Sequence, residues 1–227
     1  MKFNMAGISV MLAMPTHRDL PPETVGSLLD TQQACFERGI PLQVYFGKGS
    51  SLVHHARSKI AWQFLQTPFT RLFWIDSDMA WSSEAFLRLL GLSTVKDVIA
   101  AAYPPRHATG NWFIRFDQET IVADEHGCLE AKDLGLGFAC LSRKVIEKLA
   151  DQAPKARFPD INDGNPIPHI FRMGMSGDMA MGEDVAFWAD VRSLGYSLSI
   201  DPTIELGHIG QKVFTGSLMQ HLAPQEA

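Results

Sequence analysis

Short apolar runs alternate with amphipathic stretches along the first half of the chain. Apolar runs of strand length occupy residues 7–14, 41–46, 71–75 and 97–103. Between them, apolar residues recur at helical spacing in 22–36, 52–65 and 83–91. Alternation of this kind is typical of a mostly parallel sheet flanked by helices. The pattern therefore predicts an α/β fold of the Rossmann type in a single domain.

The second half of the chain is less regular. Residues 112–116 and 120–123 suggest a hairpin, and 136–141 predicts a strand that leads into a helix over 143–150. Residues 151–182 are rich in proline and glycine, which favours a long functional loop rather than a linker between domains. A helix is expected to begin at Glu183 and to end at Gly195.

Composition narrows the function classes only a little. The 227 residues include 46% hydrophobic side chains, enough for one substantial core. A net charge of -5 without blocks of like charge gives no support for a nucleic-acid partner. No apolar stretch approaches the roughly 20 residues that span a bilayer. Three widely spaced cysteines suit a reducing compartment, so we expect a soluble cytoplasmic protein.

An acidic triplet, Asp76-Ser77-Asp78, follows the apolar run 71–75 directly. This places two carboxylates at the carboxyl end of a strand, the edge where open α/β sheets bind ligands. Carboxylate oxygens suit a divalent cation such as Mn²⁺ or Mg²⁺, and such an ion also binds diphosphates. Asp76 and Asp78 are therefore candidate metal ligands, although turn or cap residues are the alternative.

Further candidates stand later in the chain. Glu183 and Asp184 open a helix, where they either complement its dipole or take a proton from an acceptor hydroxyl. His208 lies in a short apolar segment and is a candidate third metal ligand, with a structural role as the alternative. Lys212 follows and is placed to meet a diphosphate. His54 and His55 are adjacent on a helix and point about 100° apart, which argues against a shared metal.

Three segments in order, LFWIDSDMAW, DLGLGFACLSRKVIEKL and GEDVAFWADVRSLGYSLSIDPTIELGHIG, resemble the motifs of GT-A fold glycosyltransferases that use nucleotide sugars, of the family 2 type. The resemblance runs from Leu72 to about Lys212. It implies a DxD motif in which Asp76 and Asp78 hold the metal and the sugar nucleotide, with His208 as a further ligand. It also assigns Glu183 and Asp184 to the acceptor side.

The resemblance extends to less distinctive positions. It implies that a donor, a UDP-sugar or GDP-sugar, is bound by further residues, which are Pro15, Thr16, Arg18, Arg57, Ser77, Gly137 and Lys212. Gly135 and Gly137 fall where small residues would let the sheet approach the donor sugar, or where an ordinary turn would lie. Within one domain over 1–227, residues 1–103 would form the nucleotide-binding half and 104–215 the half that completes the acceptor and metal sites.

Several alternatives remain open from the sequence. The histidine-glycine-lysine segment resembles retaining members of the family, whereas Glu-Asp at a helix start resembles inverting members. A nucleotidyltransferase would share the sheet and the metal, but Pro15-Thr16-His17-Arg18 is not the basic glycine-rich loop that such enzymes carry. A catalytically silent module that binds nucleotide sugars is the third alternative. The acceptor is not identified by any motif.

Overall fold

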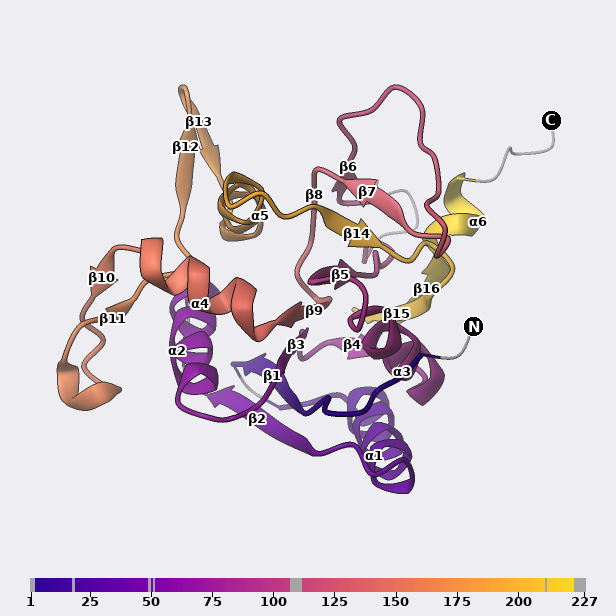
Figure 1. The fold of residues 1–227 in the computed structure, drawn as a ribbon, viewed down its shortest axis with the longest axis horizontal. Helices are drawn as coiled ribbons and strands as arrows, with labels where there is room; N and C mark the ends of the chain where they lie inside the picture. The colour runs from indigo at the N-terminus through magenta and orange to yellow at the C-terminus, as the bar shows by residue number, and fades with distance from the viewer. Residues whose placement is uncertain are drawn as a thin grey trace.

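The central feature of the computed structural model is a sheet of seven strands in the order β2-β1-β3-β9-β5-β14-β7 (Figure 1). The structure describes residues 3–17, 19–48, 50, 52–106, 112–210 and 212–222. The strands are β1 (Val10–Thr16), β2 (Leu42–Lys48), β3 (Arg71–Ile75), β5 (Val98–Ala100), β7 (Leu129–Ala131), β9 (Phe138–Ser142) and β14 (Leu198–Ile200). The predicted mixed α/β fold is confirmed.

Five of these strands run in one direction. β1 pairs in parallel with β2 and β3, and β5 pairs in parallel with β14. Between the two parallel groups lies β9, which is antiparallel to both β3 and β5, and β7 is antiparallel to β14 at the edge. The carboxyl ends of β1, β2, β3, β5 and β14 therefore share one edge of the sheet. The amino end of β9 lies at that same edge.

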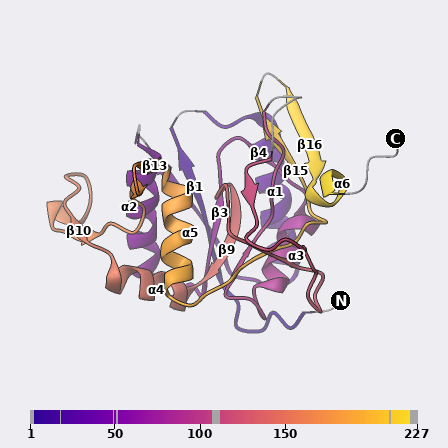
Figure 2. The same ribbon diagram turned by 90° about the horizontal axis from the view of Figure 1, so that it is seen from above.

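Helices cover both faces of the sheet (Figure 2). They are α1 (Pro22–Glu37), α2 (Val53–Leu65), α3 (Ser83–Leu92), α4 (Arg143–Gln152), α5 (Glu183–Ser193) and the short α6 (Leu218–Leu222). Side chains of β1 alternate between two buried clusters: Met11 and Ala13 pack with α2, α4 and α5, whereas Val10 and Leu12 pack with α1 and α3. This explains why the strand is apolar at every position.

The helix ends follow local chemistry. The Ser82 hydroxyl accepts a hydrogen bond from the Ala85 N–H at 3.1 Å and caps α3. Gly39 after α1 and Gly195 after α5 have φ of 65° and 81°, a conformation that glycine adopts without strain. None of the helices in the described part of the chain is long and apolar enough to cross a bilayer.

A smaller sheet brings a late segment of the chain beside the acidic turn. It contains β4 (Met79–Ala80), β15 (Glu205–Ile209) and β16 (Val213–Ser217), in the order β16-β15-β4. β15 pairs antiparallel with β4, so that His208 lies opposite Met79, and the Ile209 N–H donates to the Asp78 carbonyl at 2.8 Å. The register of this pair fixes His208 next to Asp78.

The predicted hairpin of 112–116 with 120–123 is wrong. β6 (Ile114–Arg115) pairs instead with β8 (Asp133–Leu134), and 120–123 form no strand. The buried Asp133 carboxylate, 1% exposed, accepts from Arg115 Nε at 2.7 Å and Nη2 at 2.6 Å. A buried carboxylate needs such a partner, and this ion pair selects β8 as the neighbour of β6. Val122 is 72% exposed, so it contributes little burial that would hold a strand there.

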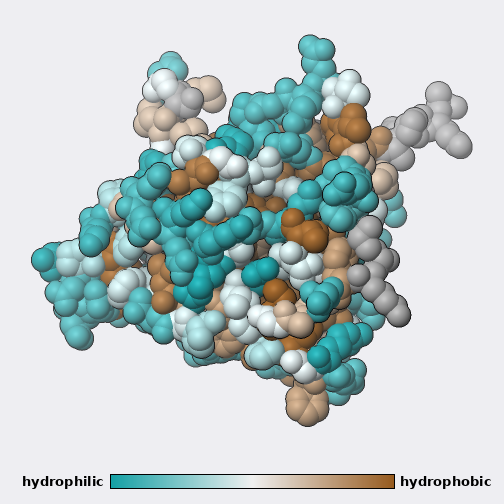
Figure 3. All heavy atoms as spheres, in the orientation of Figure 1, coloured by the Kyte–Doolittle hydropathy of each residue, from teal (hydrophilic) through white to brown (hydrophobic). Residues whose placement is uncertain are grey.

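The long segment before α5 contains short elements instead of one irregular loop. β10 (Lys155–Ala156) pairs with β11 (Ile167–Pro168), and β12 (Gly174–Ser176) pairs with β13 (Met179–Met181). A short 3-10 helix, η1 (Asn162–Gly164), lies at the tip of the first hairpin. On the face of the molecule in Figure 3, hydrophilic side chains cover most of the surface and hydrophobic ones form small separate patches.

Candidate functional site

The acidic turn lies at the carboxyl end of β3, near the middle of the sheet. Trp74 and Ile75 of this strand are fully buried, so the chain emerges from the core at Asp76. The Asp76 N–H donates to the Gly137 carbonyl at 3.1 Å, and the Thr24 hydroxyl of α1 donates to the Met79 carbonyl at 2.7 Å. Strand, helix and turn together fix the direction in which both carboxylates leave the sheet.

Asp78 and His208 share a cationic partner. The Asp78 Oδ2 atom lies 3.7 Å from His208 Nε2, and the Arg106 guanidinium contacts both side chains. Arg106 Nε donates to His208 Nε2 at 2.8 Å, while His208 Nδ1 lies 2.9 Å from the Pro104 carbonyl. An arginine only donates, so His208 Nε2 accepts and Nδ1 carries the proton. The imidazole is therefore neutral, and its Nε2 accepts from Arg106 beside the Asp78 carboxylate.

The environment of His208 favours this neutral form. Burial lowers the pKa of His208 most, and Arg106 lowers it further, against the Pro104 carbonyl and Asp76, which raise it. A neutral imidazole whose other nitrogen donates to a backbone carbonyl is the usual state of a metal-bound histidine. Asp78 Oδ2 and His208 Nε2 therefore form a donor pair suited to a divalent ion, at a place where a positive group already lies.

Arg57 joins two acidic residues that are far apart in the sequence. Its Nη2 lies 2.8 Å from Asp76 Oδ1 and its Nη1 lies 3.2 Å from Asp184 Oδ1. The residue is 2% exposed, and a guanidinium so buried needs compensating negative charge. Arg57 stands on α2 and Asp184 in the first turn of α5, so this bridge connects both helices to the acidic turn.

Asp184 has the electrostatic environment of a weak base. Burial raises the pKa of its carboxyl to about 6, with Glu183 and Asp76 adding to the rise, whereas Arg57 and the Leu136 N–H lower it. The Leu136 N–H donates to Asp184 Oδ2 at 3.3 Å. The dipeptide Leu136-Gly137, which leads into β9 at this edge, thus binds Asp184 through the Leu136 N–H and the Asp76 N–H through the Gly137 carbonyl.

The acidic and imidazole groups do not form one compact cluster. Among the described residues, the one set of three His, Cys, Asp or Glu side chains with ligand atoms within 4.8 Å of one another is His54, His55 and His169. Asp76 is directed to Arg57, whereas Asp78 faces Arg106 and His208. The predicted ligands Asp78 and His208 are therefore together, and Asp76 would have to exchange Arg57 for a metal.

The predicted donor-binding residues of β1 lie beside a hollow at the same edge of the sheet. Pro15 and Thr16 end β1, and Thr16, Phe46 and Lys48 line a hollow of about 470 Å³ with residues of the following loop. Arg18 lies outside the described residues. Ser77 contributes its carbonyl, which accepts from the Thr24 hydroxyl at 3.3 Å. The Lys212 Nζ atom lies over the Phe214 ring, 5.1 Å from its centroid.

Gly135 and Gly137 make room for Tyr103. A Cβ atom at Gly137 would lie 2.8 Å from the Tyr103 ring, and one at Gly135 would collide with its hydroxyl. Burial raises the pKa of Tyr103 far above its ordinary value, and its ring packs edge-on against His208 with centroids 5.0 Å apart. In the structure the two glycines therefore accommodate a partly buried tyrosine whose ring packs against His208.

Arg106 is a site residue that the sequence patterns missed. It follows Tyr103-Pro104-Pro105 after β5, so it stands beyond the carboxyl end of a strand, as Asp76 does. That position is the signal that points to it. No charge pattern or spacing distinguishes it from the other arginines of the chain.

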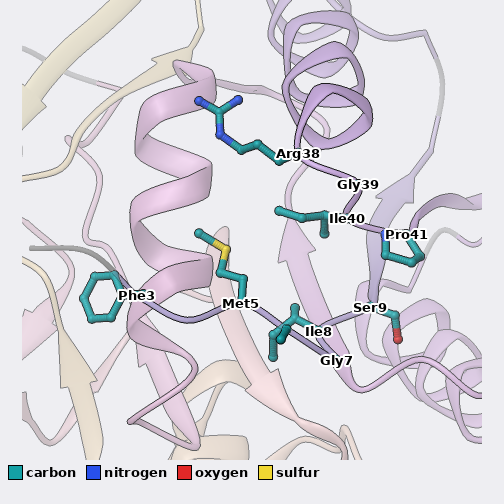
Figure 4. Close-up of a pocket in the computed structure, with 10 residues that line it drawn as sticks. Phe3, Met5, Gly7, Ile8, Ser9, Arg38, Gly39, Ile40 and Pro41 are labelled. Carbon is teal, nitrogen blue, oxygen red and sulfur yellow. The ribbon is translucent and has the colours of Figure 1, made fainter.

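A second hollow adjoins Glu183 and Asp184. It measures about 760 Å³ and is lined by apolar and charged side chains, including Trp112, Phe113, Met175, Met179 and Arg192. A third hollow, of about 590 Å³, is lined by Phe3, Ile8 and Arg38 and is drawn in Figure 4. It lies at the amino ends of β1 and β2. That pocket is at the opposite edge of the sheet from the acidic turn.

The similarity of this chain to known proteins is one of fold. No family model and no curated protein matches it. The solved structure of A197 from STIV is similar with a TM-score of 0.58 and 15% identity, over 97% of this chain and 99% of that one. This match shows a shared fold along nearly the whole length of both chains.

Two glycosyltransferase structures are also among the similar chains. GalNAc-T7 with UDP, GalNAc and Mn²⁺ has a TM-score of 0.47 and 12% identity, over 89% of this chain and 44% of that one. The catalytic domain of Drosophila beta1,4galactosyltransferase 7 in complex with xylobiose has a TM-score of 0.43 and 12% identity, over 87% and 66%. Likeness at this level does not identify a substrate.

Proposed function

We propose that this chain is a glycosyltransferase that moves a sugar from a nucleoside diphosphate to a hydroxyl acceptor, with help from a divalent metal. The observation that carries the proposal is the pairing of Asp78 with neutral His208 around the positive group of Arg106. Two chain segments 130 residues apart meet there at the carboxyl edge of the sheet, which supports the proposal. A site that already attracts a cation between a carboxylate and an imidazole suits Mn²⁺ or Mg²⁺.

In this proposal Asp76, Asp78 and His208 hold the metal. When bound, the ion neutralises the negative charge that develops on the departing diphosphate. For an ion to bind there, Arg106 would have to leave the space between Asp78 and His208. Its guanidinium would then be free to form charge-assisted hydrogen bonds with the phosphate oxygens of the donor.

Asp184 is the better candidate of the two acids for the general base. Its carboxyl, with a pKa of about 6, is mostly ionised at neutral pH and still basic enough to take a proton as a new bond forms. The acceptor oxygen then bonds to the anomeric carbon, the bond from that carbon to the phosphate oxygen breaks, and the proton passes to Asp184. Arg57 keeps the carboxylate oriented through Nη1.

The two hollows suggest where the substrates lie. The hollow beside Thr16, Phe46 and Lys48 adjoins the ends of β1 and β2 and suits the nucleoside of a UDP-sugar or GDP-sugar. The hollow beside Trp112, Met175 and Met179 adjoins Asp184 and suits the acceptor, with the indole as a stacking surface for a sugar ring. The metal position lies at the sheet edge that both hollows share.

The proposal is tested with purified protein, Mn²⁺ and a panel of UDP-sugars and GDP-sugars. Release of nucleoside diphosphate with at least one donor, and its loss in Asp78→Ala, is the expected result. The matched control is Asp30→Asn on the exposed face of α1, which should keep full activity. The proposal fails if no donor is hydrolysed or transferred and no nucleotide binds in a metal-dependent way.

A further inference from the structure

Three histidines from separate segments converge beside α2. His54 and His55 stand in the first turn of this helix, and His169 follows β11 directly. One ligand atom of each lies within 4.8 Å of those of the other two. The ring centroids are 4.4 Å apart for His54 and His55, 5.8 Å for His55 and His169, and 6.2 Å for His54 and His169.

The backbone around His169 is fixed against α2. The Ser58 hydroxyl donates to the Phe171 carbonyl at 3.1 Å and accepts from the Phe171 N–H at 3.0 Å. The His169 N–H donates to the Pro154 carbonyl at 2.8 Å. The Phe158 ring packs edge-on against both His55 and His169, with centroids 5.1 Å and 5.6 Å away. Hydrogen bonds therefore fix the backbone on one side of the cluster, and the Phe158 ring packs against the cluster on another side.

The divergence expected of neighbouring helix positions does not keep the imidazoles of His54 and His55 apart. The 100° between His54 and His55 separates their Cα–Cβ bonds, but the imidazoles turn toward each other and approach edge to face. A third imidazole then arrives from a segment more than 100 residues later in the chain. The sequence alone gave no reason to place His169 beside them.

The cluster has features that suit a bound metal ion. His169 Nε2 is buried and has no hydrogen-bond partner in the described structure, although an unpaired buried nitrogen costs about 1–3 kcal/mol. Burial, then the neighbouring imidazoles, lower the pKa of His169, and burial followed by His54 and Lys59 lowers that of His55. Asp160 opposes the shift at His55. His55 and His169 are thus neutral, with lone pairs free to bind a metal.

We propose that His54, His55 and His169 bind one Zn²⁺ ion, at a second metal site separate from the acidic turn. Three imidazole nitrogens suit Zn²⁺ and related transition ions, whereas Mg²⁺ and Mn²⁺ prefer the oxygen ligands at Asp76 and Asp78. Zn–N bonds of 2.0–2.1 Å in a tetrahedral site place ligand nitrogens about 3.4 Å apart. The nitrogens, now within 4.8 Å, reach that spacing through small rotations of the side chains. The fourth position is left to water.

The site would brace the neighbourhood of the acidic turn. His54 and His55 precede Arg57 on the same helix, and Arg57 holds both Asp76 and Asp184. His169 belongs to the segment that leads from β11 toward α5. A bound Zn²⁺ therefore links the first turn of α2 to this segment. This inference stands on the histidine cluster itself and does not require the proposed transferase activity.

The experiment measures Zn²⁺ binding by the full chain, prepared without a histidine tag and stripped with a chelator. Zn²⁺ is titrated in competition with a chromogenic chelator while excess Mg²⁺ fills the acidic site. We expect one tightly held Zn²⁺ per chain in both wild type and Asp78→Ala. Loss of an outer partner of a metal site costs about 10–100-fold in affinity, so removal of a ligand in His169→Gln or His54→Gln should weaken binding by at least roughly tenfold.

The control is His221→Gln. His221 is exposed and stacks on Trp112, outside the histidine cluster, so this change should leave Zn²⁺ binding unchanged. Co²⁺ replaces Zn²⁺ as a second probe, and its visible bands should show nitrogen ligation in wild type and disappear in His54→Gln. Circular dichroism confirms that each variant is folded, and His54→Gln replaces His169→Gln if the latter unfolds. Failure of wild type to hold Zn²⁺ in excess Mg²⁺ overturns the proposal. Equal affinity of wild type and the folded histidine variants overturns it as well.

Discussion

Arg57 and Asp184 form an ion pair at 3.2 Å across the sheet edge, although 127 residues separate them in the sequence. The same guanidinium holds Asp76 at 2.8 Å, so one buried positive charge orients an acid of the acidic turn and the acid proposed as the base. Any change at Arg57 therefore alters both halves of the proposed site together.

The first prediction concerns the stability of this network. Arg57→Met leaves two partly buried carboxylates without their positive partner, and the free energy of unfolding should fall by about 3–5 kcal/mol. Urea unfolding followed by circular dichroism measures the loss. The control is Arg172→Met, which removes a half-exposed pair with Asp190 and should cost less than about 1 kcal/mol. Similar losses in the two variants would contradict the special role of Arg57.

A second prediction concerns Arg106 as a competitor of the metal. Arg106→Ala removes the guanidinium that lies against Asp78 and His208, so Mn²⁺ alone should bind more tightly. A half-exposed ion pair contributes at most about 1 kcal/mol, which limits the gain to about fivefold. Binding of a nucleoside diphosphate in the presence of Mn²⁺ should weaken at the same time, because the phosphate loses a donor.

Calorimetric titrations with Mn²⁺ and then with UDP or GDP measure both effects. Arg157→Ala serves as the control, because this exposed arginine donates to the Gly164 carbonyl away from the site. Unchanged Mn²⁺ affinity in Arg106→Ala would show that the guanidinium does not occupy the metal position in solution.

The third prediction concerns pH and Asp184. The carboxyl must be deprotonated to act as a base, so the rate of transfer should rise with pH through about 6 and then level off. Stability should change in the opposite direction. The ordinary pKa of this carboxyl is 3.8, and the folded chain raises it to about 6, so between these pH values Asp184 binds its proton more tightly in the folded chain than in the unfolded chain. The stability that Asp184 contributes is thus present at low pH and is lost as pH rises through about 6.

Initial rates and urea unfolding across about pH 5 to about pH 8 test both statements. Asp184→Asn should bind donor, lose transfer and lose this component of the pH dependence of stability, whereas Asp30→Asn should keep all three properties. A rate profile that retains its acidic limb in Asp184→Asn would assign the base elsewhere, with Glu183 as the next candidate.

Local patterns in the sequence predict those elements whose own residues determine them. β3 has the predicted bounds of 71–75, and α1, α2 and α3 lie within a residue or two of the predicted ranges. These segments have continuous burial or clear end signals such as Ser82 and Gly39. The direction of β9, in contrast, could not be predicted from the residues of the strand itself. Residues 136–141 indicate a strand, but only packing between β3 and β5 makes it antiparallel to both.

The candidate site also combines features that local sequence predicts with features that only the folded chain reveals. Asp76 and Asp78 could be predicted because they follow a buried strand directly, and His208 because it stands in a recognisable order of motifs. Their contacts could not, because Arg106 reaches Asp78 and His208 from the segment after β5, and Arg57 reaches Asp76 from α2, through side-chain geometry that no spacing encodes. The histidine cluster is the clearest case. The adjacency of His54 and His55 on a helix argued against a shared ligand site, and no sequence pattern predicted that His169 would lie beside them.

The antiparallel entry of β9 has a consequence for mutational tolerance. Leu136 holds Asp184 through its N–H, and Gly137 holds Asp76 through its carbonyl, so both contacts belong to the backbone. Apolar replacements of Leu136 that fill the same volume leave these hydrogen bonds intact, whereas proline would remove the donor. Apolar substitutions at this position are therefore decoupled from the chemistry of the two acids.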